Sequence, residues 1–244
     1  KPPGPSGPSL PTPLHPLGNT TRPTHVLPFP PRRRADSPPI LRLSPEYDGM
    51  ELLYANDQHP DTLFSVKILA WARLENGDTL AMVPWLRKLA SAHELADPLN
   101  GRWEGYRLPE SDYLFCEAPP HKVQELDAAV SFFGKPNFDN PARGLVQEIP
   151  DTIGTHAVFS EDEFETLSLM KVVSWRLYGD GSAQAMVADE AAVTQTPVLP
   201  GDRCLVPAQK EPDFRYFFQH GIANRLKEHD PEALAAIAIL NARQ

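Results

Sequence analysis

The alternation of apolar and polar residues is clearest in one stretch, and this stretch occurs twice along the chain. Residues 62–83 read TLFSVKILAWARLENGDTLAMV, and residues 166–187 read TLSLMKVVSWRLYGDGSAQAMV. The two segments align without a gap, and their identical pairs include Lys67/Lys171, Trp71/Trp175, Gly77/Gly181 and Met82/Met186. Self-similarity of this kind marks a duplicated structural unit, so the sequence predicts two homologous units in tandem.

Each copy has the pattern of a β-hairpin. Val66–Leu74 is rich in β-branched and aromatic residues and contains no Pro or Gly, which favours a strand. Asn76-Gly77 and Asp180-Gly181 are typical of a two-residue type I′ turn, which needs φ > 0 at both central residues. With that loop length, the facing cross-strand pairs would be Trp71 with Met82 and Trp175 with Met186.

Strand alternation separates the two faces of the first hairpin strand. One face is amphipathic, and the other is wholly apolar and is expected to be the core face. The amphipathic face carries Lys67, Leu69, Trp71 and Arg73, and the apolar face carries Val66, Ile68, Ala70 and Ala72.

The segments around the hairpins have their own periodicities. Residues 40–56 predict one or two short strands, broken at Ser44-Pro45 and Asp48-Gly49. The apolar spacing predicts helices over 85–95, from Pro120 to Gly134, over 214–227, and from Asp230 onward. Residues 96–106 read as a Gly/Pro/aromatic loop that only the first copy has.

These elements predict an α+β, β-rich protein with two tandem homologous units. Each unit would be a short antiparallel sheet closed by a helix, and an SH3-like barrel is one form that such a sheet could take. The outline is similar to SH3-like and BAH-type reader modules at the level of fold analogy. The expected divisions are a proline-rich disordered tail at 1–39, a first unit at 40–134, a linker at 135–149, a second unit at 150–229 and a C-terminal helix at 230–244.

Composition changes this picture mainly at the N-terminus. Nearly half of the 28 prolines lie in residues 1–39, so this segment has few backbone donors and little to bury. Residues 28–33 (PFPPRR) fit the P-x-x-P-x-R pattern that SH3-type grooves bind, through Pro28, Pro31 and Arg33. A linker that matches this pattern by chance is the competing interpretation.

The charge is unevenly distributed. The chain carries −9, while residues 1–40 carry +4, so the remainder carries −13. An acidic body argues against nonspecific nucleic-acid binding by the folded part, and leaves the Arg-rich tail as the basic segment. We find no apolar run that predicts a membrane span or a signal peptide, and two cysteines fit a reducing compartment. We therefore expect a cytoplasmic protein.

The sequence offers few residues with catalytic promise. Nucleotide-binding glycine motifs and a GxSxG nucleophile motif are missing from it. Residues 57–61 hold an Asp-x-His-x-Asp pattern, but a solvated loop is the simpler interpretation. His121 and Glu125 share a helix face, which fits either a general base pair or a surface contact. Cys116 follows apolar residues and is expected to be an inert buried thiol. We therefore expect no metal and no cofactor.

Four residues are candidates for binding. Lys67 and Lys171 occupy the same position in both copies, beside the repeated tryptophan, where either snorkelling or a binding role is possible. Trp103 and Tyr106 lie in the segment expected to be a loop, where binding residues concentrate. The alternative is that this loop folds over its own core with Trp103 as a plug.

These observations favour a non-catalytic binding or interaction module, such as an adaptor or assembly factor, with a protein partner. The chain has no coherent catalytic set, which is the main support for this hypothesis. The second hypothesis is a hydrolase-type enzyme with its site in the cleft between the two units. The third is regulatory contact with nucleic acid through Arg32–Arg34.

Overall fold

Antiparallel strands dominate the part of the chain that the computed structural model describes, namely residues 38–56, 59–95, 102–111, 114–138, 144–160, 166–188 and 204–219. The predicted tail up to residue 37, with its P-x-x-P-x-R pattern and arginines, and the predicted C-terminal helix at 230–244 lie outside the described residues. The elements are β1 (Ile40–Pro45), β2 (Glu51–Asn56), β3 (His59–Lys67), β4 (Ala70–Leu74), β5 (Thr79–Trp85), β6 (Lys88–Ser91), α1 (Ala92–Leu95), β7 (Arg102–Arg107), β8 (Leu114–Phe115), α2 (Pro120–Phe133), β9 (Leu145–Pro150), β10 (His156–Phe159), β11 (Ser168–Tyr178), β12 (Ala183–Ala188), β13 (Leu205–Pro207), the 3₁₀ helix η1 (Ala208–Lys210) and β14 (Phe214–Phe218).

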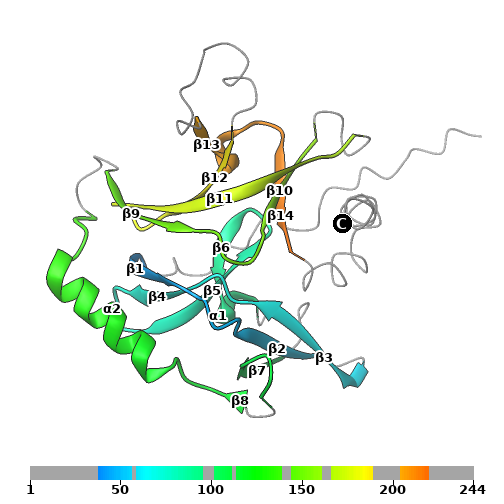
Figure 1. Ribbon diagram of the computed structural model, residues 1–244, viewed down its shortest axis with the longest axis vertical. Coiled ribbons are helices and arrows are strands. Elements are labelled where there is room, and N and C mark those ends of the chain that lie inside the picture. Colours follow the sequence, from blue (N-terminus) through cyan, green and yellow to red (C-terminus); the bar gives the residue numbers. More distant parts are fainter. Residues whose placement is uncertain are drawn as a thin grey trace, which may run out of the picture. The chain divides into compact units, whose positions relative to one another are not determined.

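The described strands form three sheets (Figure 1). Their orders are β1-β4-β5-β6, β3-β2-β7-β8 and β13-β12-β11-β10-β14, and β9 also pairs with β11 in the third sheet. The described pairs are antiparallel, so the β-rich α+β class is confirmed. None of the three sheets closes into a barrel over the described residues.

Both predicted hairpins are present, as β4–β5 and β11–β12, but the predicted two-residue turn is wrong. The backbone N–H of Leu74 donates to the carbonyl of Asp78, so three residues form the loop. Gly77 has φ +95°, whereas Asn76 keeps a negative φ and its side chain accepts the N–H of Asp78. A type I′ turn needs positive φ at both positions, which explains why it does not form here.

The longer loop moves the register by one residue. Trp71 faces Ala81, and Ala70 faces Met82, so the predicted Trp71–Met82 pair is wrong. The second hairpin has the same loop, because the N–H of Tyr178 donates to the carbonyl of Ser182. There the facing pairs are Trp175 with Ala185 and Ser174 with Met186.

Two hydrophobic clusters hold the sheets together. The first core lies within residues 50–126 and includes Met50, Leu52, Ile68, Trp71, Val83, Tyr106 and Leu126. The second cluster, which we call the shared core, lies between the third sheet and the face of sheet β1-β4-β5-β6 that points away from the first core. It includes Leu43, Ala70, Ala72, Met82, Trp175, Phe214 and Phe217. The prediction of one core face for the first hairpin is therefore wrong, because both faces of β4 are buried.

Three predicted elements are wrong, and in each the chain forms a paired strand instead. Residues 85–95 turn at Leu86, which has φ +50°, and return as β6 beside β5. Residues 102–107 are not loop but strand β7, paired with β2. Residues 214–218 form β14, paired with β10, where a helix is predicted. Strands β7 and β14 pair with strands far away in the sequence, and β6 pairs with its neighbour β5. Local apolar spacing reports none of these pairings.

Helix α2 is confirmed from Pro120 to Phe133, with Gly134 ending it at φ +76°. It lies beside β1 and β4 (Figure 1). Leu126 is buried, whereas Phe133 at the end of the predicted apolar stripe is 68% exposed. Strand β9 begins at Leu145, inside the stretch predicted to be a linker.

Candidate functional site

Three aromatic side chains of the first core form a continuous stack. The rings of Trp103 and Tyr106 on β7 are 5.1 Å apart and edge to face, and Tyr106 meets Trp71 on β4 in the same way at 4.9 Å. Tyr106 and Trp71 are 2% and 0% exposed, and Trp103 is half-buried. Burial raises the pKa of the Tyr106 phenol to about 12, although a backbone hydrogen bond with Ala81 acts in the opposite direction.

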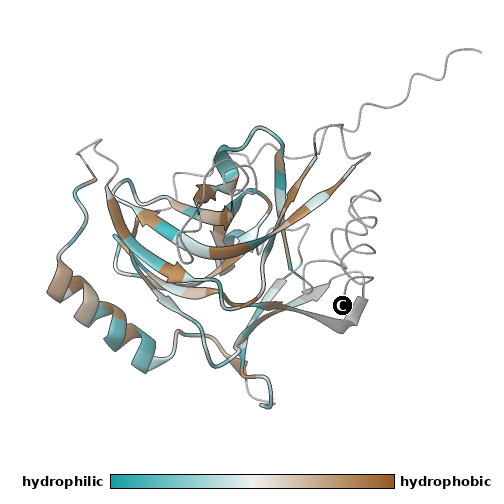
Figure 2. Cartoon of the chain, turned by 45° about the horizontal axis from the view of Figure 1, so that its top comes forward, coloured by the Kyte–Doolittle hydropathy of each residue, from teal (hydrophilic) through white to brown (hydrophobic). Residues whose placement is uncertain are grey.

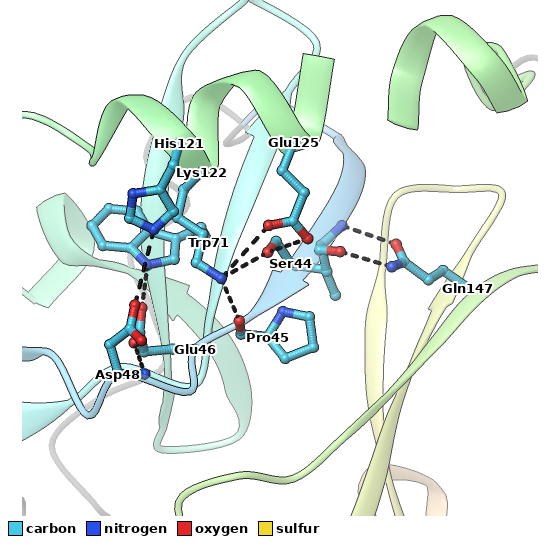
Figure 3. A network of polar contacts seen from close by, with 10 residues as sticks. Ser44, Pro45, Glu46, Asp48, Trp71, His121, Lys122, Glu125 and Gln147 are labelled. Carbon is cyan, nitrogen blue, oxygen red and sulfur yellow. Dashed lines mark hydrogen bonds and ion pairs between the residues drawn. The ribbon is translucent and has the colours of Figure 1, made fainter. Parts of the chain in front are cut away.

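The inner end of this stack is held by a buried carboxylate. The indole N–H of Trp71 donates to Glu46 Oε2 at 2.7 Å, and the N–H of Asp48 donates to Oε1 of the same residue at 2.6 Å (Figure 3). The third sheet repeats the arrangement, with Trp175 donating to Asp151 Oδ2 at 3.0 Å. An acceptor is needed at both places, because a buried indole N–H without a partner is destabilising.

A second polar cluster joins α2 to β1. Lys122 is 6% exposed, and its Nζ donates to Ser44 Oγ at 3.1 Å and to the Pro45 carbonyl at 2.8 Å. Ser44 in turn donates to Glu125 Oε1 at 2.9 Å (Figure 3). A serine between a lysine and a carboxylate could suggest a nucleophile. Ser44 is only 1% exposed, however, so the cluster acts as a clamp that fixes the helix on the sheet.

The other predicted catalytic residues are dispersed or lie outside the described part. His121 is on the exposed side of α2, 3.9 Å from Asp48, while Glu125 contacts Ser44. Cys116 is exposed, so its prediction as a buried thiol is wrong. The structure does not describe Asp57, nor the side chains of His59 and Asp61. Within the described ranges, no three His, Cys, Asp or Glu side chains gather in an arrangement that could hold a metal ion.

The outer edge of sheet β3-β2-β7-β8 exposes a group of apolar side chains. Strand β8 pairs with β7, so that Phe115 faces Tyr106 and Leu114 faces Arg107. We define the edge surface as Tyr47 (70% exposed), Leu108 (36%), Leu114 (45%) and Phe115 (44%). The Tyr47 loop lies near this edge, since a Cβ on Gly49 would be 3.2 Å from Pro109.

A shallow hollow of about 390 Å³ lies next to the edge surface. It lies between the β4–β5 turn, β8 and the start of α2, and its walls combine charged and apolar groups. Arg73 in its wall is paired with Asp127 at 2.8 Å and donates to Thr79 Oγ1. The lining includes Arg73, Asp78, Leu80, Tyr106, Cys116 and Val123.

Lys67 and Lys171 are both exposed and occupy matching positions in their sheets. Lys67 faces Glu51 across β2–β3, and Glu51 forms an ion pair with Arg107 at 3.1 Å. Lys171 faces His156 across β10–β11. The structure therefore brings Trp103 and Tyr106 together, but it places the two lysines on separate sheets.

Sequence reasoning missed the edge surface. The run from Leu114 to Cys116 reads as a buried strand, because apolar periodicity does not distinguish an edge strand from a central one. Its brevity and the turn residues on both sides were the available signal, since edge strands are often very short.

No known protein family, curated protein or solved structure matches this sequence. Among the described helices, none has the length and apolar character needed to cross a lipid bilayer.

Proposed function

We propose that this chain contains two copies of one β unit, a first unit at residues 40–107 and a second at 145–218. The support is that corresponding strands have the same pairing. Trp71 faces Ala81 as Trp175 faces Ala185, and Leu52 lies between Val66 and Tyr106 as Ala157 lies between Met170 and Phe217. The register shifts also correspond, since one follows Leu53 on β2 and the other follows Val158 on β10.

The order β13-β12-β11-β10-β14, with η1 before the last strand, supports an SH3-like relationship for the second unit. The predicted alignment of the copies needs revision on this basis. Strand β7, taken from the sequence as an insertion, corresponds to β14. The element that the second unit lacks among the described strands is β8.

We infer that the protein is a non-catalytic protein-binding module whose contact surface lies on the first unit. The observation that carries this proposal is strand β8, which exposes Leu114 and Phe115 at a sheet edge. Leu108 is exposed just after β7, and Tyr47 is exposed in a loop that approaches Pro109. Clustered exposed apolar side chains are typical of protein contact sites. A sheet edge also offers backbone groups to an extended partner segment.

The four residues predicted for binding have distinct parts in this proposal. Trp103 and Tyr106 support β7 from within, and Trp103 keeps some exposed area of its own. Tyr106 is buried, so it positions the surface and is not itself a contact. Lys67 and Lys171 remain proposed charged contacts on the outer faces of the two units.

The alternative hydrolase site between the units has less support. The described junction is filled, since the shared core contains side chains from both units. The N–H of Phe217 donates to the carbonyl of Leu86 at 2.7 Å, and Arg87 donates to the carbonyl of Phe214 at 2.6 Å. A role in nucleic-acid binding depends on Arg32–Arg34, which lie outside the described residues.

A site-specific crosslink tests the proposed surface. A photoreactive amino acid replaces Leu114 in one sample and Leu145, which is 54% exposed on β9, in the control. We expect a specific protein adduct from position 114 in the cells that make this protein, and none of the same mass from position 145. The partner so identified should then bind the Phe115→Ser variant about 30-fold more weakly, as for a central interface anchor. Equal capture by both positions, or unchanged affinity of Phe115→Ser, would overturn the assignment.

A further inference from the structure

Arg42 on β1 is a buried cation that has no carboxylate partner within the described part of the chain. It is 7% exposed, and its Nε is buried without a hydrogen-bond acceptor. Its other contacts are to carbonyl groups, with Nη1 donating to Leu41 at 3.4 Å and Nη2 to Gly134 at 3.3 Å. A guanidinium has five N–H donors, so these two long bonds leave most of its capacity unused.

Its direct cross-strand neighbour provides the contrast. Arg73 faces Arg42 across β1–β4, and both side chains lie beside α2. Arg73 is paired with Asp127 on that helix at 2.8 Å. Arg107 and Arg176 on other strands likewise pair with Glu51 and Glu148. Arg42 therefore differs from these three arginines, because no carboxylate of the described residues pairs with it.

The surroundings of Arg42 compensate its charge only in part. The end of α2 offers the negative pole of the helix dipole, and the guanidinium carbon is 5.2 Å from the Phe133 ring centroid. Each of these effects is usually worth about 1 kcal/mol or less when the site is accessible to water. Burying a charge without a counter-ion is unfavourable, and burial lowers the pKa of Arg42.

The groups above Arg42 are apolar and exposed. Phe132 and Phe133 are 82% and 68% exposed, and their rings are 4.8 Å apart, edge to face. Figure 2 shows that α2 is hydrophilic near its N-terminal end and more hydrophobic towards this end. The Phe133 side chain is 68% exposed, so a rotation of its ring away from the guanidinium would meet solvent on the outer side. The described residues thus place an exposed aromatic pair next to a buried cation for which they provide no carboxylate.

We propose that Arg42, Phe132 and Phe133 form a second docking site, for a partner-protein segment that carries a carboxylate next to an apolar side chain. The carboxylate would pair with the guanidinium of Arg42, and the apolar side chain would cover the two phenylalanine rings. Charge complementarity selects this occupant, because Arg and carboxylate match in a two-pronged geometry. The site is separate from the edge surface and does not depend on it.

Peptide selection tests this site with the full chain. A random 12-residue peptide library displayed on phage is selected against the protein and counter-selected against Arg42→Met. We expect the retained peptides to carry Asp or Glu beside Leu, Ile or Phe. Replacing that acid by its amide in a retained peptide should weaken binding at least tenfold. The Arg42 Nε–H resonance should shift when the acidic peptide binds and should not shift with the amide.

The exposed residue Phe132 gives a variant that does not disturb the core. Phe132→Ser should weaken the same peptides at least fivefold and leave the thermal melting temperature unchanged. This variant and the amide peptide keep the test decisive if Arg42→Met fails to fold. Retained peptides without an acidic residue, equal binding to Phe132→Ser, or no enrichment at all would overturn the proposal. Peptides that lose affinity with Phe115→Ser and keep it with Phe132→Ser belong to the edge surface and also count against the Arg42 site.

Discussion

The two proposed β units pair their strands in the same way but differ in what lies outside them. Gly105 faces Leu53 in the first unit, and Tyr216 faces Val158 in the second. A Cβ on Gly105 would be 2.8 Å from the carbonyl oxygen of Phe115, so the glycine makes room for β8. No described strand covers β14, and a large residue is accommodated there. The strand pairing is thus common to the two proposed units, while the outer strand β8 requires a small residue at position 105.

Each proposed unit buries a central tryptophan, and replacing it should give the largest loss of stability. Trp71 and Trp175 are each 0% exposed, so Trp71→Ala and Trp175→Ala should each lower the free energy of unfolding by about 3–5 kcal/mol. Urea unfolding followed by far-UV circular dichroism measures both. Trp71→Phe and Trp175→Phe, which keep a ring, serve as controls and should be milder. A loss below about 1 kcal/mol for either alanine variant would show that the units are not built alike.

The next largest loss of stability should come from Gly105→Ala, at a position where only the first proposed unit has an outer strand among the described residues. Gly105 has φ +143°, so Gly105→Ala adds backbone strain and pushes β8 away, at a cost of about 1–3 kcal/mol. Hydrogen exchange at residues 106, 107, 114 and 115 should accelerate, because β8 loses its pairing. Gly77→Ala is the matched control, since Gly77 also has positive φ but no atom lies within 4 Å of the added Cβ. Similar exchange rates in the two variants would contradict the role assigned to Gly105.

Tyr106 and Phe217 occupy corresponding positions, since Tyr106 faces Leu52 and Phe217 faces Ala157. Only Tyr106 has a group that can ionise. The pKa of Tyr106 is raised to about 12 in the folded chain, against about 10 when unfolded. The unfolded state therefore loses this proton first, and stability that is complete below about pH 10 should fall as the pH rises through 12. The loss should be on the order of 2 kcal/mol.

The variant Tyr106→Phe should flatten the stability profile between about pH 10 and 12. Thermal melting across this range measures the slope. Tyr47→Phe, at a residue that is 70% exposed, is the control and should leave the slope as it is in the parent. If Tyr106→Phe leaves the slope of the parent protein unchanged, a group other than Tyr106 causes the loss of stability at alkaline pH.

The smallest effect concerns a polar contact on the second unit. Partial burial acts to raise the pKa of Glu148, but hydrogen bonds from Ser174 and Arg176 hold it below its usual value. Glu148→Gln should cost about 0.2–1 kcal/mol at neutral pH, since the pair is partly exposed.

This contribution requires the ionised carboxylate, so it should disappear as the pH falls through the lowered pKa. Melting curves at neutral and acid pH compare Glu148→Gln with Glu75→Gln, a substitution at an exposed residue in the β4–β5 turn. A difference that persists at about pH 2 would show that the contact is not electrostatic.

The hairpins, β1, β2 and α2 could be predicted from the sequence because their signals are local. Turn residues, the strand composition and Pro120 with Gly134 specify them within a few positions. The exact register could not be predicted, since Asn76 and Asp180 are residues that suit two kinds of loop. Strands β7 and β14 could not be predicted because their partners are β2 and β10, far away in the sequence.

The candidate site was predictable only in its aromatic part. Trp103 and Tyr106 stand out in composition, and they do form a stack with Trp71. Their burial follows from the pairing of β7, which composition does not reveal. Arg42 has no carboxylate partner among the described residues, and this depends on which carboxylates lie nearby in space, so no sequence pattern could indicate it.

The shared core has a consequence for how this chain is made. The first core is composed of residues 50–126, so it can assemble soon after that part has left the ribosome. The shared core also needs Phe214 and Phe217, near the end of the described chain. Until these residues emerge, Leu43, Ala70 and Met82 remain uncovered on the nascent protein. We therefore expect the growing chain to expose this apolar face, and to be prone to aggregation, in the interval before β14 arrives.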